Sequence, residues 1–170
     1  MQTKGKKGFT LLEVLVVVLI AVLVTLFAVP AYKKSQDKNR YLAASGVLMD
    51  LANAVRMTLE EYPTVNTGSV QVTKSAFTTS DLGDALTVAP NGNLVVWMFQ
   101  NQYFNEFPLD NSNKYMGYSY AVSTAATIDT PANCGNSCAK TNAIACMSGN
   151  NANTQFTCAW VDKSGILHHN

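Results

Sequence analysis

The chain has 170 residues, of which 48% are hydrophobic, and its 12 basic and 11 acidic side chains give a formal net charge of +1. This length suits one compact domain with a modest core. The nearly balanced charge gives no general electrostatic basis for nucleic-acid binding, which depends on strongly basic surfaces.

The N-terminal residues combine a short basic segment with a long apolar run. Three lysines precede Gly8, and Phe9 begins a run that continues to Val29 with one charged residue, Glu13. As a helix, residues 9–31 would be about 34 Å long, enough to cross a hydrocarbon core of about 30 Å. A charged side chain at the centre of a spanning helix costs on the order of 2.5 to 3.5 kcal/mol, so Glu13 should have a partner.

The N-terminal segment has basic residues before a Gly-Phe junction, followed by Thr10-Leu11-Leu12-Glu13 and an uncharged apolar run. On these residues it resembles the class III leader of type IV pilins and type II secretion pseudopilins. The resemblance implies a leader of residues 1–8, cleavage by a prepilin peptidase after Gly8, and N-methylation of Phe9. The new amine on Phe9 would pair with Glu13 in the same chain or in a neighbouring subunit, which would set the register of assembly.

A signal peptide or an ordinary membrane anchor that carries a glutamate is the alternative to such a leader. A signal peptide ends in a small-residue cleavage site after its apolar region, and residues 27–32 do not present a convincing one.

Charge is a poor guide to membrane topology here, because basic residues flank the apolar run on both sides. The resemblance places the leader in the cytoplasm and the rest of the chain outside the bacterial inner membrane, and later in an extracellular pilus filament. It also implies the partners, which are other copies of the chain, a prepilin peptidase and methyltransferase, an inner-membrane assembly platform and a motor ATPase.

Beyond the apolar run the pattern predicts that the helix continues. Pro30 removes one helical hydrogen bond, which predicts a kink, and the resemblance implies local melting of the helix there in a filament. An amphipathic half over residues 32–62 is predicted by apolar residues at three- and four-residue steps: Tyr41, Ala44, Leu48, Leu51, Val55, Leu59 and Tyr62. The polar residues 33–40 are interpreted as a solvated stretch, or alternatively as a subunit contact.

Residues 63–170 have the composition of loops and short strands. Residues 85–88 and 94–99 flank an Asn-Gly turn and form a candidate hairpin. Further strand candidates are residues 115–122, 144–147 and 155–161. The predicted fold class is α+β, with a long N-terminal helix whose amphipathic half packs on an antiparallel sheet, as the resemblance to type IV pilins also implies.

All four cysteines lie near the C-terminus, at Cys134, Cys138, Cys146 and Cys158. This clustering predicts a disulfide-closed region over residues 134–158 on the oxidising side of the membrane, with three possible connectivities. Zinc is the alternative use, but the uneven spacing lacks the paired C-x2-C pattern of structural zinc sites.

No cofactor and no metal is predicted. Calcium would need several oxygen ligands, for which Asp129, Asp162, Asn133, Asn136 and Asn150 are the candidates in the cysteine-rich region. The terminal His168 and His169 are expected to be flexible rather than metal-binding.

The pattern predicts a structural subunit rather than an enzyme, because no catalytic constellation or glycine-rich phosphate loop is recognisable. By the resemblance, the chain is a major pilin that polymerises through its N-terminal helix into a type IV pilus for adhesion, motility or DNA uptake. The alternatives are a minor pilin, a pseudopilin of a type II secretion system and, from a different class, a membrane-anchored enzyme. The cysteine-rich region favours a pilin, since the resemblance implies a C-terminal calcium loop in major pseudopilins.

Overall fold

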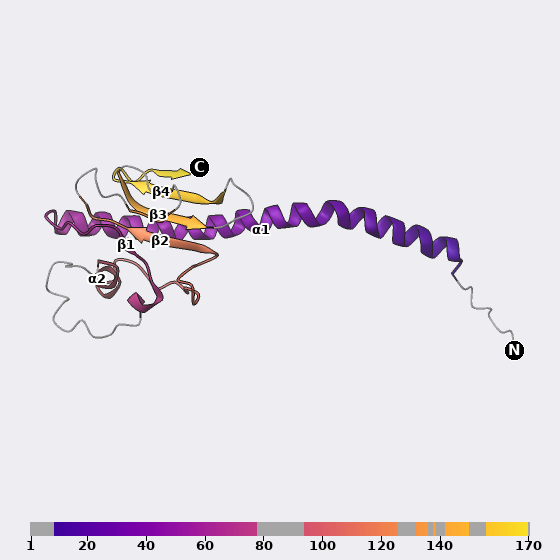
Figure 1. Cartoon of the computed structure of the whole chain (residues 1–170), viewed down its shortest axis with the longest axis horizontal. Helices are drawn as coiled ribbons and strands as arrows, with labels where there is room; N and C mark the ends of the chain where they lie inside the picture. The colour runs from indigo at the N-terminus through magenta and orange to yellow at the C-terminus, as the bar shows by residue number, and fades with distance from the viewer. Residues whose placement is uncertain are drawn as a thin grey trace. The chain divides into compact units, whose positions relative to one another are not determined.

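A computed structural model describes residues 9–77, 94–125, 132–135, 138, 142–149 and 156–169 of the chain. The chain divides into two compact units, Met1–Gln36 and Asp37–Asn170. In order, the elements are α1 (Leu11–Glu61), β1 (Val70–Gln71), the 3-10 helix η1 (Lys74–Phe77), α2 (Leu94–Gln100), β2 (Tyr118–Val122), β3 (Ala143–Gly149), β4 (Cys158–Asp162) and β5 (Leu167–His169) (Figure 1).

Helix α1 begins with a cap formed by Thr10. The backbone amide of Glu13 donates to Thr10 Oγ1 at 3.3 Å and to the Thr10 carbonyl at 3.0 Å. This Thr-x-x-Glu spacing is that of a capping box, and an acidic residue in the first turn suits the positive end of the helix dipole. The helix therefore begins at Leu11, two residues after Phe9.

Helix α1 then continues through Pro30 and ends at Glu61. Proline lacks the amide hydrogen that an interior helical position donates, yet α1 has no break at Pro30. Local melting at Pro30 in a filament stays a prediction.

Within the described residues, five strands form one antiparallel sheet in the order β1-β2-β3-β4-β5, so neighbours in sequence are neighbours in the sheet. The strands predicted around residues 115–122, 144–147 and 155–161 correspond to β2, β3 and β4. Together with α1, this sheet confirms the predicted α+β architecture of a type IV pilin-like fold.

The hairpin predicted from residues 85–88 and 94–99 is wrong, because the second of these segments is helix α2. Residues 85–88 lie outside the described residues. A short apolar run does not distinguish a buried strand from a buried helix, and here the buried positions follow a helical period. They are Leu94, Val95, Trp97 and Met98.

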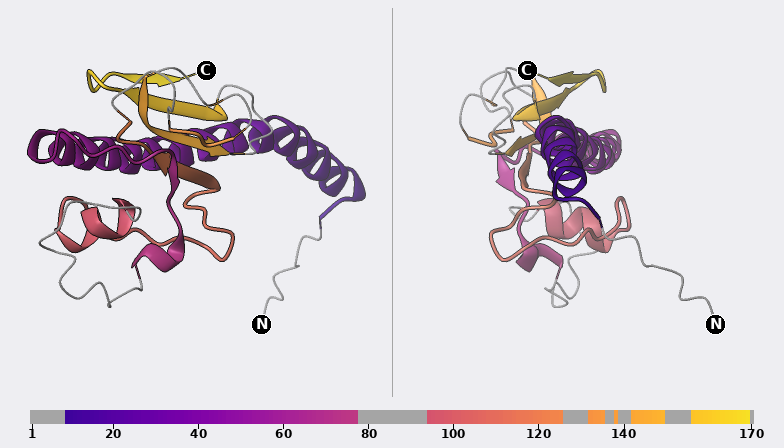
Figure 2. Two further views of the ribbon diagram at one scale, coloured as in Figure 1. Left: turned by 60° about the vertical axis from the view of Figure 1, so that its left-hand side comes forward. Right: turned by 90° about the vertical axis from the view of Figure 1, so that its right-hand side faces the viewer.

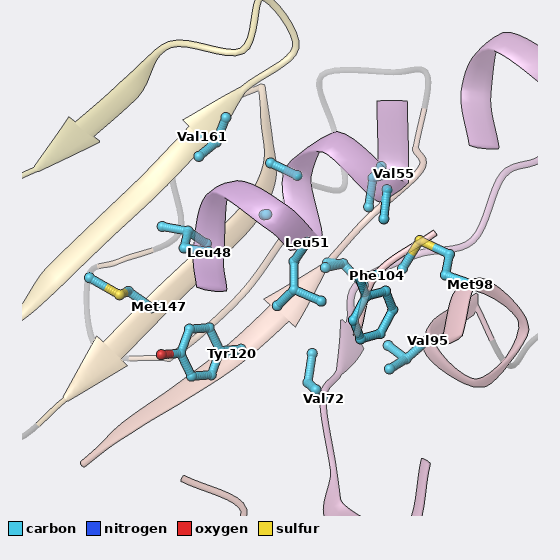
Figure 3. Packing of buried hydrophobic residues seen from close by; sticks show 14 of the residues in the cluster. Leu48, Leu51, Val55, Val72, Val95, Met98, Phe104, Tyr120, Met147 and Val161 are labelled. Atoms are coloured by element: carbon cyan, nitrogen blue, oxygen red, sulfur yellow. The ribbon is translucent and has the colours of Figure 1, made fainter. Parts of the chain in front are cut away.

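The main core lies between the sheet and the part of α1 within the second unit (Figure 2). Leu48, Leu51 and Val55 of α1 are fully buried, and Leu48 and Leu51 point towards residues that the sheet presents to the helix (Figure 3). Those residues include Tyr120, Met147 and Val161. The Tyr120 hydroxyl donates to the Ala44 carbonyl at 3.2 Å, which joins β2 to α1 by a buried hydrogen bond.

Candidate functional site

The first unit carries an apolar helix surface that nothing in that unit covers. All residues from 9 to 36 are exposed, and the most apolar 18-residue window of α1 has a mean hydropathy of 3.1 with none of it buried. An exposed apolar surface of this extent marks a membrane or protein interface, and its length is enough to cross a bilayer. One side of it is lined by Phe9, Leu11, Val14, Leu15, Val18, Leu19, Val22 and Leu23.

Glu13 is the charged residue of this surface, and it lies in the first turn of α1. Among the described residues, its carboxylate takes part in no salt bridge. The leader is still attached in this chain, so the nitrogen of Phe9 is a peptide nitrogen rather than a charged amine. The predicted pairing between Phe9 and Glu13 therefore stays a prediction, and Gly8 lies outside the described residues.

The capping role of Thr10 was missed in the sequence, although a signal for it was present. Thr10-Leu11-Leu12-Glu13 matches the S/T-x-x-E pattern that precedes an apolar helix. Glu13 thus contributes to the start of the helix through its amide as well as carrying the lone charge. A substitution of the Glu13 side chain keeps this amide, so a variant that removes the Thr10 hydroxyl is the way to test the cap by itself.

The N-terminal segment also matches a known motif. Residues 3–29 match the prokaryotic N-terminal methylation motif. The match spans the Gly8-Phe9 junction and Glu13, and it supports the class of type IV pilins and pseudopilins, as the resemblance predicted. No curated protein and no solved structure shows significant similarity to the chain.

The methylation motif implies processing by a prepilin peptidase and assembly into a pilus-like filament. Together with the apolar helix, it fits anchoring in the membrane before assembly. A leader of this kind belongs to structural subunits, which is consistent with a protein that is not an enzyme.

The cysteines form two disulfides, Cys134–Cys146 and Cys138–Cys158. Their Cα atoms are 6.0 and 5.7 Å apart, within the range that disulfides span. This pairing selects one of the three connectivities that the sequence left open. It also leaves no cysteine thiolate to bind zinc.

The oxygen ligands considered for calcium have other partners where they are described. Asp162 Oδ1 accepts the amides of Ser164 and Ile166 at 2.8 and 3.0 Å, and Asn133 Oδ1 accepts the amide of Gly135 at 2.8 Å. Asp129, Asn136 and Asn150 lie outside the described residues. Within the part of the chain that the structure describes, no three His, Cys, Asp or Glu side chains form a group that could hold a metal.

The two C-terminal histidines belong to β5, so the expectation of a flexible tail is wrong. His168 is placed by two contacts, a 2.7 Å hydrogen bond between its Nε2 and Asp162 Oδ2 and a stacked arrangement on Trp160 with ring centroids 5.3 Å apart. Desolvation by burial opposes the ionisation of Asp162, but hydrogen bonds from His168 and two backbone amides outweigh it, and the pKa of the carboxyl is lowered. Leu167–His169 thus form the edge strand of the sheet next to β4.

Proposed function

We propose that this chain is the major subunit of a type IV pilus. In this proposal it is stored in the bacterial inner membrane with residues 1–8 in the cytoplasm and residues 63–170 outside as the head, and it is then assembled into an extracellular filament. The observation that carries the proposal is the methylation motif at the start of an apolar helix whose side chains remain exposed.

The proposed steps follow from the chemistry of that segment. A prepilin peptidase cleaves after Gly8 and methylates Phe9, which leaves a charged nitrogen four residues before Glu13. Each ion offsets the desolvation of the other, and the full interaction forms only when neighbouring helices have the correct axial register. Residues 9–31 then form the filament core, residues 32–62 support the head, and Pro30 permits local unwinding.

Three further kinds of partner belong to this proposal: other copies of the chain, the assembly platform in the inner membrane and the motor ATPase that drives extraction. The two disulfides support a pilin over a pseudopilin, because the resemblance implies a C-terminal calcium loop in major pseudopilins, where this chain has two disulfides. Adhesion, motility and DNA uptake are the activities proposed for the filament.

The first test is the intact mass of the protein in sheared surface filaments and in membranes. We expect a species that begins with methylated Phe9 in the sheared fraction, with a mass increase of about four units on reduction of both disulfides. Processed protein that never reaches the sheared fraction would favour the pseudopilin. An uncut or unmethylated chain confined to membranes would contradict the whole class.

Glu13→Ala tests the assembly role of the carboxylate. We expect a processed, membrane-inserted subunit whose filament yield falls at least about tenfold, because an unpaired Phe9 amine would be left in the apolar bundle. Thr10→Ala removes the helix cap but keeps the carboxylate, and Thr25→Ala removes a polar side chain from the same run; both should assemble normally. A normal filament yield from Glu13→Ala would refute the register mechanism, and equal losses in Thr10→Ala would assign the effect to helix capping.

A further inference from the structure

The segment 132–135 lies on the face of the sheet opposite to α1. Ala121, Cys146 and Trp160 are paired across β2, β3 and β4, whereas the adjacent Tyr120 and Met147 belong to the core beneath α1. Side chains alternate between the two faces of a sheet, so the cross-strand row of Ala121, Cys146 and Trp160 points away from the helix. A second cluster of small residues and cystines covers this outer face: Ala121, Ala132, Cys134, Cys138, Ala143, Cys146 and Cys158.

Asn133 connects this outer segment to the edge strand β1. Its amide donates to Ser69 Oγ at 2.8 Å, and its carbonyl accepts from Gln71 Nε2 at 2.6 Å. Strand β1 has two residues, Val70 and Gln71, which pair with β2, and the amide of the next residue, Val72, donates to the Tyr120 carbonyl of β2 at 2.9 Å. So short an edge strand has little intrinsic stability, and the two bonds to Asn133 add to this pairing and to the buried hydrogen bonds between Thr67 and Thr124 just before it.

The two disulfides differ in what they hold. Cys134 follows Asn133 directly, so its bond to Cys146 fixes the residue that binds β1. Cys138 is bonded to Cys158 of β4, and its sulfur is fully buried beside the carbonyls of Met147 and Ala159 at 3.0 and 3.8 Å. A disulfide sulfur carries no proton, so these are packing contacts that enclose the sulfur.

The two disulfides also differ in how far their cysteines are exposed to solvent. Cys134 is 9% exposed, whereas Cys138 and Cys158 are 0% and 3% exposed. Reduction begins when a thiolate reaches one sulfur of the bond, so exposure of a single sulfur decides where the attack starts. Cys134 is the most exposed of the four cysteine residues, and its partner Cys146 is 0% exposed.

We propose that Cys134–Cys146, together with the bonds from Asn133 to Ser69 and Gln71, is a redox-sensitive clamp on the edge strand β1. A dithiol attacks the Cys134 sulfur, the disulfide breaks, and Cys146 leaves as a thiolate. The second thiol of the reductant then displaces Cys134, which leaves two protein thiols and an oxidised cyclic disulfide. Asn133 is then held through the hydrogen bond from the adjacent Ala132 amide to the Ala143 carbonyl at 2.8 Å without the covalent link, and β1 is loosened while Cys138–Cys158 remains closed.

This inference does not rest on the proposed function, because both disulfides lie in the second unit and the test needs no filament. The full chain in detergent micelles is treated with increasing dithiothreitol, alkylated, and analysed by peptide mass spectrometry. We expect Cys134 and Cys146 to be alkylated about tenfold earlier than the other pair. In the half-reduced species, hydrogen exchange should quicken about tenfold in peptides covering residues 67–72 and stay unchanged in residues 48–55.

A double variant separates the effect of the hydrogen bonds to Asn133 from the effect of the disulfide. Ser69→Ala with Gln71→Ala removes both bonds to Asn133, and with the disulfides intact it should quicken exchange in residues 67–72 as reduction does. Ser119→Ala is the matched control, because its hydroxyl donates to the Ser148 carbonyl on the same outer face at 3.1 Å. Faster or simultaneous reduction of Cys138–Cys158 overturns the proposal. So does unchanged exchange in the double variant, or general unfolding of the head in the half-reduced species.

Discussion

The two parts of α1 place similar apolar side chains in opposite environments. Leu19 in the first unit is 54% exposed, whereas Leu51 in the second unit is fully buried against the sheet. Around Leu19 the helix is apolar on all sides, which is typical of a helix that needs lipid or other helices around it. Around Leu51 the apolar residues follow one face. The comparison teaches that the width of an apolar surface indicates whether a helix is completed by its own fold or by an external partner.

The largest expected effect comes from making the same substitution in both parts of the helix. Leu51→Ala should lower the free energy of unfolding of the head by about 2 to 5 kcal/mol, because it opens a cavity in the core. Leu19→Ala should leave that free energy unchanged. Urea unfolding of the chain in micelles, followed by tryptophan fluorescence, measures both, since Trp97 and Trp160 lie in the head.

Equal losses of stability in these two variants would break the comparison. Such a result would mean that the surface around Leu19 is buried by the head's own residues in solution.

A smaller effect on stability is expected from removing one tyrosine hydroxyl in the second unit, and none from removing one in the first unit. Burial raises the pKa of Tyr120, so its hydroxyl stays protonated and donates to Ala44. Tyr120→Phe should therefore destabilise the head by about 1 kcal/mol, with the Ala44 carbonyl still bonded within the helix. Tyr32→Phe removes a hydroxyl that accepts from Gln36 on an exposed surface, and the urea midpoint should not change.

The smallest effect concerns the Asp162 carboxyl at the β4–β5 turn. Its pKa is lowered in the folded chain, so the stability it contributes is present above the unfolded value of 3.8 and is lost as the pH falls through the folded pKa. Between pH 5 and strongly acidic pH, Asp162→Asn should show a smaller fall in the urea midpoint than the parent. Asp50→Asn, an exposed carboxylate on α1, reports the general effect of removing one negative charge.

An identical acid response of the parent chain and Asp162→Asn would show that the hydrogen bonds from His168 and the two amides add no stability. The hairpin between β4 and β5 would then be stabilised by its strand pairing, its backbone turn and the Trp160–His168 stack.

Patterns that involve residues close in sequence were predicted well. The basic leader, Gly8-Phe9 junction and Glu13 form a local signature, and the methylation motif confirms it over residues 3–29. The buried face of α1 from Tyr41 to Val55 was also predicted, because helical geometry fixes which residues share a side. In both cases the chain itself carries the geometric information.

Other features were decided only by the tertiary structure. Whether Leu94–Gln100 is strand or helix depends on the surfaces that bury it, because a short apolar run fits either. Which cysteines pair depends on Cys134 lying next to Cys146 of β3 and Cys138 lying next to Cys158 of β4, and spacing does not contain that information. The order of His168 comes from Asp162 and Trp160, which meet it only once β5 has paired with β4.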